Sequence, residues 1–154
     1  MSVLLLFPNN LFNVKFLPKT TKIYLLEDPV FFGMRDIKMK FNKLKLIMHR
    51  ASMKYYHDYL KDKKLKVTYI DFNKLKDLKY SSLKKEKNVS CFELNDHLLE
   101  KRLNKVFDEI KIIPNPNFIL SSESLERYHE SKKNKNKYFH KNFYDFVKAE
   151  INLL

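Results

Sequence analysis

Short runs of apolar residues alternate along this chain with segments of helical periodicity. Residues 3–7, 22–26 and 66–71 form three such runs, and residues 89–92 and 110–113 form two weaker ones. The first run is apolar at every position, which is typical of a strand covered on both faces. Strands separated by helical crossovers pair in parallel. The order therefore predicts an α/β fold: a three-layer, doubly wound, Rossmann-like parallel sheet of about five strands with a C-terminal helix.

Helical periodicity is clearest between the second and third predicted strands. A long helix is expected over residues 41–61, with an inward face formed by residues at three- and four-residue steps: Leu44, Ile47, Met48, Ala51, Tyr55 and Tyr59. A second helix is expected over residues 96–107. A third should begin near Ser121, because a serine side chain can cap the first free N–H groups of a helix. Residues 139–154 predict a final amphipathic helix that either folds back on the sheet or docks on another polypeptide.

The balance of charge is strongly basic. The chain has 154 residues, which is enough for one sizeable hydrophobic core. Its net charge is +13. Such a charge favours association with a polyanion, because each neutralised phosphate releases counterions. The chain also has much Lys, Asn and Phe with a single Gly and no Trp, a composition expected from AT-rich coding. Charge alone therefore leaves both explanations open.

The single cysteine bears on location and on metal chemistry. Cys91 cannot form an internal disulfide, and without a second cysteine the chain has no zinc or iron–sulfur ligand spacing. An intracellular location is expected. The apolar run at residues 3–7 is too short for a signal peptide or a membrane span, so no membrane association is expected.

Polar residues follow the predicted strands, at the edge where open parallel sheets bind ligands. They are Asn9 and Asn10 after the first strand, Glu27 and Asp28 after the second, Asp71 after the third, and Glu93, Asn95 and Asp96 after the fourth. This acidic and amide-rich set suits hydrogen bonding to a polyol or to a heteroaromatic ring. The same residue types also make turns and helix caps, so each position has two interpretations.

Common catalytic and nucleotide-binding motifs do not occur in the sequence. Gly33 is the only glycine and does not follow the first strand, so a glycine-rich phosphate loop is not expected there. No G-x-S-x-G or H-E-x-x-H pattern is present either. Catalysis by this chain alone is not expected.

Basic and aromatic residues mix on the long helix. As a nucleic-acid surface, this helix would offer phosphate contacts from Lys45, Arg50 and Lys54, and DNA is a candidate partner. The alternative is an ordinary amphipathic crossover helix with a solvated basic face.

Five segments, in order, resemble those of the photolyase-related and cryptochrome-like proteins, which include the bacterial iron–sulfur (6-4) photolyases. The segments are residues 8–12 (PNNLF), 27–32 (EDPVFF), 43–53 (KLKLIMHRASM), 98–103 (LLEKRL) and 114–121 (PNPNFILS). The longest is similar to the H-K-x-K-L-x-x-H-R-A-S-M helix of that family. It departs from the pattern at Asn42, where the family has His, and residues 33–40 resemble an altered or lengthened loop.

The resemblance implies a fold and a role. It implies an N-terminal antenna-type α/β domain over residues 1–130, followed at residues 131–154 by a basic loop and an amphipathic helix that lead toward a helical domain absent from this chain. The chain would then be an isolated or truncated part of a DNA-repair or light-responsive protein, and not catalytic alone.

The resemblance also implies a cofactor and a partner. A lumazine-type antenna chromophore is expected in the strand-end crevice, lined by Asn9, Asn10, Glu27, Phe32 and Lys43. Flavin and the iron–sulfur cluster belong to the helical domain of the family, so neither site is expected within this chain. A separate flavin-binding helical photolyase-like chain is the partner that the resemblance implies.

Overall fold

The computed structural model describes two compact units of the chain. The described residues are 2–19, 22–33, 41–75, 80, 83–132 and 137–153. Contacts divide the chain into Met1–Ile113 and Pro114–Leu154. The altered loop expected at residues 33–40 lies outside the described residues except for Gly33, and so do residues 133–136 of the basic loop. The division into domains after residue 130 stays a prediction.

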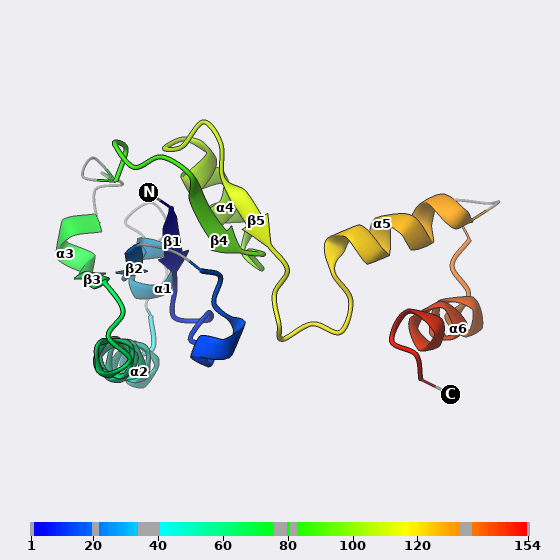
Figure 1. Ribbon diagram of the computed structural model, residues 1–154, viewed down its shortest axis with the longest axis horizontal. Coiled ribbons are helices and arrows are strands. Elements are labelled where there is room, and N and C mark those ends of the chain that lie inside the picture. The colour runs from blue at the N-terminus through cyan, green and yellow to red at the C-terminus, as the bar shows by residue number, and fades with distance from the viewer. Residues whose placement is uncertain are drawn as a thin grey trace. The chain divides into compact units, whose positions relative to one another are not determined.

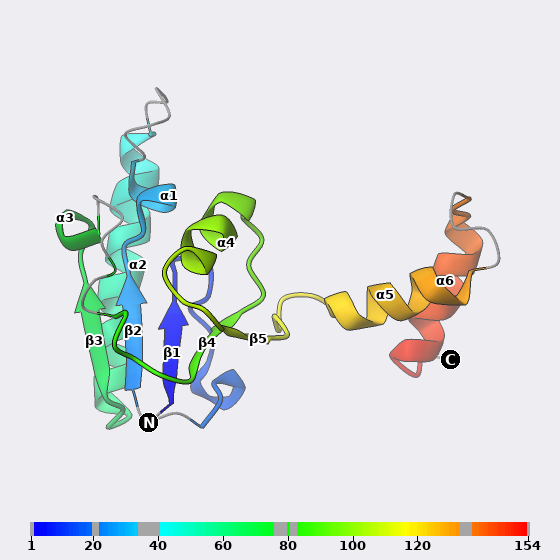
Figure 2. The same cartoon turned by 90° about the horizontal axis from the view of Figure 1, so that it is seen from above.

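The first unit contains a five-stranded sheet. Its strands are β1 (Val3–Leu6), β2 (Lys22–Leu26), β3 (Val67–Ile70), β4 (Val89–Phe92) and β5 (Lys111–Ile113). Their order is β3-β2-β1-β4-β5, and all four pairings are parallel (Figures 1 and 2). All five predicted strands are confirmed. From β1, the chain adds β2 and then β3 on one side. It adds β4 and then β5 on the other side of β1, so the strand order reverses between β1 and β4.

The sheet is covered on both faces. Along β1, Val3 and Leu5 pack on one side with Leu99 of α4 (His97–Asn104). Leu4 and Leu6 pack on the other side, in the cluster that contains the buried residues of α2 (Lys43–Asp62). Figure 1 shows α2 and α4 on opposite sides of the sheet. Because β1 is buried on both faces, every one of its residues is apolar. The parallel sheet with helices on both faces (Figure 1) confirms the predicted three-layer, Rossmann-like α/β fold.

The long predicted helix is confirmed as α2, but its predicted inward face is wrong. The helix begins after Asn42, whose side-chain oxygen accepts hydrogen bonds from two backbone N–H groups of the first turn. It buries Met53, Tyr56 and Leu60 against the sheet. The predicted inward residues Leu44, Ile47, Met48 and Tyr55 are instead 59–77% exposed.

Two polar contacts fix this rotation of α2. The Tyr56 hydroxyl donates to the backbone oxygen of Phe12 at 2.6 Å, and Arg50 forms an ion pair with Glu27 at 2.6 Å. Both partners lie in the sheet or in the loops that border it. A helix with apolar residues on two sides can bury either side, and these contacts decide in favour of Tyr56.

Three short helices were not expected from the sequence. They are the 3₁₀ helix η1 (Val14–Phe16), α1 (Pro29–Phe32) and α3 (Phe72–Leu75). The start of α1 has a local signature, because Asp28 caps the helix and Pro29 occupies its first turn. Gly33 ends α1 with φ 131°, a conformation that L side chains rarely adopt.

The second unit is a pair of helices, α5 (Ser122–Ser131) and α6 (His140–Glu150). Ser121 caps α5 as expected, its hydroxyl accepting from the backbone N–H of Ser124. The predicted final helix is confirmed as α6, which packs on α5 through Phe143 and Phe146, each with its ring centroid 5.1 Å from that of Tyr128. No helix in the described parts of the chain is long and apolar enough to cross a membrane.

Candidate functional site

The carboxylate of Glu27, directly after β2, is buried and saturated with hydrogen bonds. It accepts from Nε and Nη2 of Arg50 at 2.7 and 2.6 Å, from the Tyr69 hydroxyl at 2.5 Å and from the backbone N–H of Phe72 at 2.9 Å. Its side chain has no exposed surface. This group, the Glu27 clamp, joins the ends of β2 and β3 to the middle of α2.

The clamp also sets the protonation of Glu27. Burial alone would raise the pKa of this carboxyl, but the hydrogen bonds from Arg50, Tyr69 and Phe72 hold the pKa below its ordinary value. The carboxylate is therefore ionised at neutral pH, and its oxygens already serve four donors. Glu27 was predicted to line a cofactor pocket. In the structure its carboxylate accepts hydrogen bonds that join the sheet to α2.

Asp28, the next residue, forms a second buried cluster on the opposite face of the sheet. Its carboxylate accepts from the backbone N–H of Val30 at 2.8 Å, from the Tyr80 hydroxyl and from Arg102 Nη2 at 3.2 Å. Burial and the charge of Asp28 raise the pKa of Tyr80 well above its ordinary value, so this phenol stays protonated and donates. Adjacent carboxylates at the end of β2 thus tie the sheet to α2 on one face and to α4 on the other.

Asn9 and Asn10 follow β1 at the point where the strand order reverses. The backbone of Asn10 is held in place, because its N–H donates to the Phe7 oxygen at 2.9 Å and its oxygen accepts from the Phe12 N–H at 3.0 Å. Its side chain is fully buried. Among the described residues, neither Nδ2 nor Oδ1 of Asn10 has a hydrogen-bond partner, and the buried Oδ1 of Asn9 has none either.

Aromatic rings connect this end of β1 to α2. The Phe7 ring lies 6.4 Å from that of Phe31, and the His49 ring lies 6.1 Å from Phe31 and 6.2 Å from Phe32. The buried Nε2 of His49 has no hydrogen-bond partner in the described parts of the chain. Burial and the nearby charge of Lys45 lower the pKa of His49, so the imidazole is neutral at neutral pH.

These groups form a candidate site that the prediction covered only in part. Asn9, Asn10 and Phe32 were expected at the strand-end crevice, whereas His49 was not assigned to it. The signal for His49 was its position one residue before Arg50 in a motif shared with the photolyase-related proteins. The candidate site thus has two parts: the buried amides after β1, and the neutral imidazole of α2 with its phenyl neighbours.

The predicted lysines on α2 have different surroundings. Lys43 and Lys45 are exposed in the first turn of the helix. The Lys54 ammonium lies 3.7 Å from the centroid of the Tyr69 ring, and the Arg50 guanidinium belongs to the Glu27 clamp while lying 5.5 Å from the Phe32 ring. Of the three residues predicted to contact nucleic acid, only Lys45 has no ion pair or ring contact described for its ammonium.

Several other residues after the strands have local structural roles. Asp96 caps α4 by accepting from the backbone N–H groups of Leu98 and Leu99 at 2.8 and 3.0 Å. Asp71 accepts from the backbone N–H of Lys74 at 3.3 Å. The capping interpretation is therefore the one that the structure supports at these two positions. Among the described residues, no group of three or more His, Cys, Asp or Glu side chains is placed to hold a metal ion.

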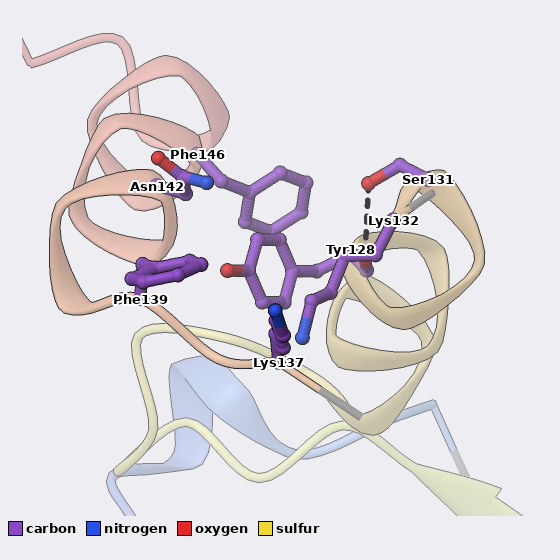
Figure 3. A pocket seen from close by; sticks show the side chains of 7 residues that line it. All are labelled: Tyr128, Ser131, Lys132, Lys137, Phe139, Asn142 and Phe146. Carbon is purple, nitrogen blue, oxygen red and sulfur yellow. Dashed lines mark hydrogen bonds between the residues drawn. The ribbon is translucent and has the colours of Figure 1, made fainter. Parts of the chain in front are cut away.

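The second unit has a pocket of its own, of about 420 Å³, between α5 and α6. Figure 3 shows the Tyr128 hydroxyl pointing toward Phe139, with the Lys132 and Lys137 side chains on one side of the tyrosine ring. The hydroxyl is buried and has no hydrogen-bond partner among the described residues. Since the Lys132 ammonium lies 2.9 Å from the centroid of the Tyr138 ring, it is held by aromatic faces rather than by a carboxylate.

The residues after β1 fit part of what a lumazine-type chromophore requires. A flat heteroaromatic ring presents donors and acceptors on its edge, and the unpaired Asn10 amide offers one of each. Glu27 does not fit the role, because four donors already occupy its oxygens. The unpaired polar atoms that remain for such a ligand are amide atoms of Asn9 and Asn10 and the His49 Nε2, and not a free carboxylate.

Comparison with known proteins assigns the chain to a family. A family model described as "Deoxyribodipyrimidine photo-lyase-related protein" matches residues 5–154. An uncharacterized protein of Acanthamoeba polyphaga mimivirus is 34% identical over 165 residues, which cover 99% of this chain and 84% of that protein. No solved structure gives a significant match. Because the family model spans the sheet and both helices of the second unit, this chain belongs to the deoxyribodipyrimidine photo-lyase-related protein family.

Proposed function

We propose that this chain acts as an antenna-type α/β domain of the kind found in the iron–sulfur (6-4) photolyases, and that it binds a heteroaromatic chromophore at the carboxyl end of β1. In this proposal the domain is not catalytic by itself. It supplies light energy to, or positions, a flavin-binding helical domain that carries out DNA repair or a light response.

The observation that carries the proposal is the Asn10 side chain. It is completely buried, and both of its polar atoms lack a partner among the described residues. Leaving such a group unpaired costs about 1–3 kcal/mol. A bound ring that accepts from Nδ2 and donates to Oδ1 would recover that free energy. The position, beside the reversal of strand order, is where open α/β sheets bind their ligands.

His49 and the phenyl rings of α1 support the same ligand class. A neutral imidazole can donate or accept at Nε2, depending on its tautomer. Phe31 and Phe32 provide apolar surface against which a flat ring can stack. A phosphate is a less suitable ligand for these groups, because the Asn10 amide and the neutral imidazole are uncharged and the neighbouring Arg50 is already paired with Glu27.

The test is an absorption spectrum of the protein purified from a host that makes lumazine and flavin, recorded before dialysis. The proposal predicts a near-ultraviolet or blue band that stays with the protein. Asn10→Leu keeps the approximate volume and removes both hydrogen-bonding groups, so it should lose the band. Asn104→Leu, at an exposed position of α4, is the matched control and should retain it.

Two outcomes would reject the antenna role. One is a colourless wild-type protein that also fails to bind added lumazine in a titration. The other is a bound chromophore that Asn10→Leu retains as well as the control does, which would place the ligand elsewhere. Circular dichroism of each variant shows whether the fold is intact.

A basic nucleic-acid-binding function is the second candidate, and the net charge of +13 favours it. Lys43 and Lys45 are exposed cations in the first turn of α2 and are available for phosphate contacts. Duplex affinity measured against salt concentration tests this function, since phosphate contacts produce a steep linear fall of log affinity with log salt. An affinity unchanged by Lys43→Gln with Lys45→Gln would exclude the first turn of α2 as the contact surface.

A further inference from the structure

The exposed side of α2 carries an apolar stripe that the fold does not use. It consists of Leu44, Ile47, Met48, Ala51 and Tyr55, called here the outer stripe. The exposed fractions of its four larger side chains are 75% for Leu44, 59% for Ile47, 60% for Met48 and 77% for Tyr55. Successive residues of an α-helix are 100° apart, which places these five within an arc of about 100°. Met53 and Leu60, which are buried, lie on the opposite side of the same helix.

The outer stripe has the width of a face that is normally buried. A helix on the surface of a single domain usually shows one apolar arc toward the core and a polar arc toward water. Here both arcs are apolar, and the second one points away from the sheet, with its large side chains exposed among the residues that the structure describes. Contiguous exposed apolar surface of this kind is typical of an interaction site.

The sequence of the stripe is complementary to itself in the antiparallel direction. If two copies of α2 cross with a two-fold axis at Ala51, then Ile47 of each copy lies opposite Tyr55 of the other, and Ala51 faces Ala51. The small side chain on the axis allows the close approach of about 8–10 Å between helix axes that packed helices require. The larger side chains then fill the space on either side of the axis.

Charge selects the same arrangement. Lys43 and Lys45 flank the start of the stripe, and neither has an ion-pair partner described among the residues of this structure. Asp58, near the other end of the helix, has a side chain that is 76% exposed, and its ion-pair partner among the described residues is the adjacent His57, at 3.0 Å. Antiparallel pairing about Ala51 brings Asp58 of each copy opposite Leu44 of the other, between the two lysines. Parallel pairing would place lysines against lysines.

We propose that the outer stripe is the interface of a symmetric homodimer, in which α2 of one copy packs antiparallel on α2 of a second copy. The contact is isologous, so each side-chain pair occurs twice. This dimer does not depend on the antenna role, because the stripe lies on the opposite side of α2 from the sheet.

Sedimentation equilibrium of the full chain over a wide range of concentration tests the proposal. The wild type should show a monomer–dimer equilibrium. Ala51→Glu puts two carboxylates on the two-fold axis and should raise the dissociation constant by about a hundredfold or more, since juxtaposed like charges cost several kcal/mol. Lys61→Glu, exposed on the same helix beyond the paired segment, is the matched control and should leave the constant within about threefold of wild type.

A charge exchange tests the antiparallel register. Lys45→Glu faces Asp58 in two symmetric repulsive pairs, and Asp58→Lys faces both Lys43 and Lys45 in four, so each variant should weaken the dimer about threefold to tenfold. The double variant restores opposite charges between positions 45 and 58 while Lys43 still faces the introduced lysine, so it should recover part of the lost affinity.

Each other result overturns the proposal. A wild-type monomer at all concentrations shows that the stripe does not pair with itself. A dimer unaffected by Ala51→Glu places the interface elsewhere on the molecule. If the losses of dimer affinity from Lys45→Glu and Asp58→Lys simply add in the double variant, the antiparallel register about Ala51 is excluded. Because Ala51, Lys45 and Asp58 are exposed, their variants should keep the far-ultraviolet circular dichroism of the wild type.

Discussion

Replacing Glu27 by glutamine should destabilise the first unit without changing its fold. The side chain keeps its shape, but one carboxylate oxygen becomes an NH₂ group that can no longer accept. At that position the clamp presents two donors: Arg50 together with either Tyr69 or the Phe72 N–H. The variant therefore loses at least one hydrogen bond to a charged group and leaves the Arg50 guanidinium without its counterion.

The magnitude follows from the number and exposure of the broken contacts. A hydrogen bond to a charged group contributes about 1.5–3 kcal/mol, and removing one partner of a fully buried ion pair costs about 3–5 kcal/mol. The Arg50 side chain is 54% exposed, so it can turn toward water and recover part of that loss. We expect a decrease of about 2–4 kcal/mol in the free energy of unfolding, which corresponds to a melting temperature lower by about 8–16 °C at about 4 °C per kcal/mol.

The effect should depend on pH in a defined direction. The pKa of Glu27 in the folded state lies below its ordinary value of 4.5. The unfolded chain therefore binds the proton more readily, and the ion pair contributes its full stability above about pH 4.5. As pH falls through the lower pKa of the folded state, that contribution is lost. The difference in unfolding free energy between wild type and Glu27→Gln should thus shrink in acid.

Urea unfolding followed by circular dichroism measures both quantities, at neutral pH and at a series of lower values. Glu126→Gln, an exposed position on α5, is the matched control and should change stability by less than about 0.5 kcal/mol. A loss below about 1 kcal/mol for Glu27→Gln at neutral pH, or a loss that grows in acid, would refute the role assigned to the clamp.

Three further outcomes are expected from buried groups. Burial raises the pKa of the Cys91 thiol to about 12, so a thiol reagent should modify Cys91 in the native protein only as fast as the protein unfolds; rapid modification in native buffer would contradict this burial. Asp28→Asn leaves Arg102 buried beside a neutral group and should lower the unfolding free energy by about 3–5 kcal/mol in urea, more than any exposed Asp→Asn change. Tyr128→Phe removes a buried hydroxyl that has no partner among the described residues, so thermal unfolding should show a change between zero and about 1 kcal/mol of stabilisation; a clear loss would mean that the hydroxyl is hydrogen-bonded.

The sheet could be predicted from the sequence because its signals are local. Each strand is a short apolar run, and a strand buried on both faces needs apolar residues at every position, as Val3 and Leu5 on one face and Leu4 on the other illustrate. Parallel pairing followed from the helices between the runs. The edge at which Asn9 and Asn10 lie followed in turn from parallel pairing, since the carboxyl ends of all strands then point the same way.

The roles of the residues at that edge could not be predicted in the same way. Glu27 and Asn10 both follow a strand and both are polar, yet the structure surrounds Glu27 with four donors and leaves the Asn10 side chain without a described partner. The difference depends on Arg50, Tyr69 and Phe72, which lie 23 to 45 positions away in the chain. Separation in sequence carries no information on such contacts.

The rotation of α2 shows most clearly which features the sequence predicts and which depend on tertiary contacts. The sequence by itself determined that residues 43–62 form a helix, because apolar side chains recur there at three- and four-residue steps. It also contains two such series on opposite sides of the helix, one through Ile47 and Tyr55 and one through Met53 and Leu60. Periodicity describes each series equally well and cannot rank them. Only the tertiary structure decided which one is buried, because the ion pair from Arg50 to Glu27 and the packing against β1 and β2 can form for one rotation alone.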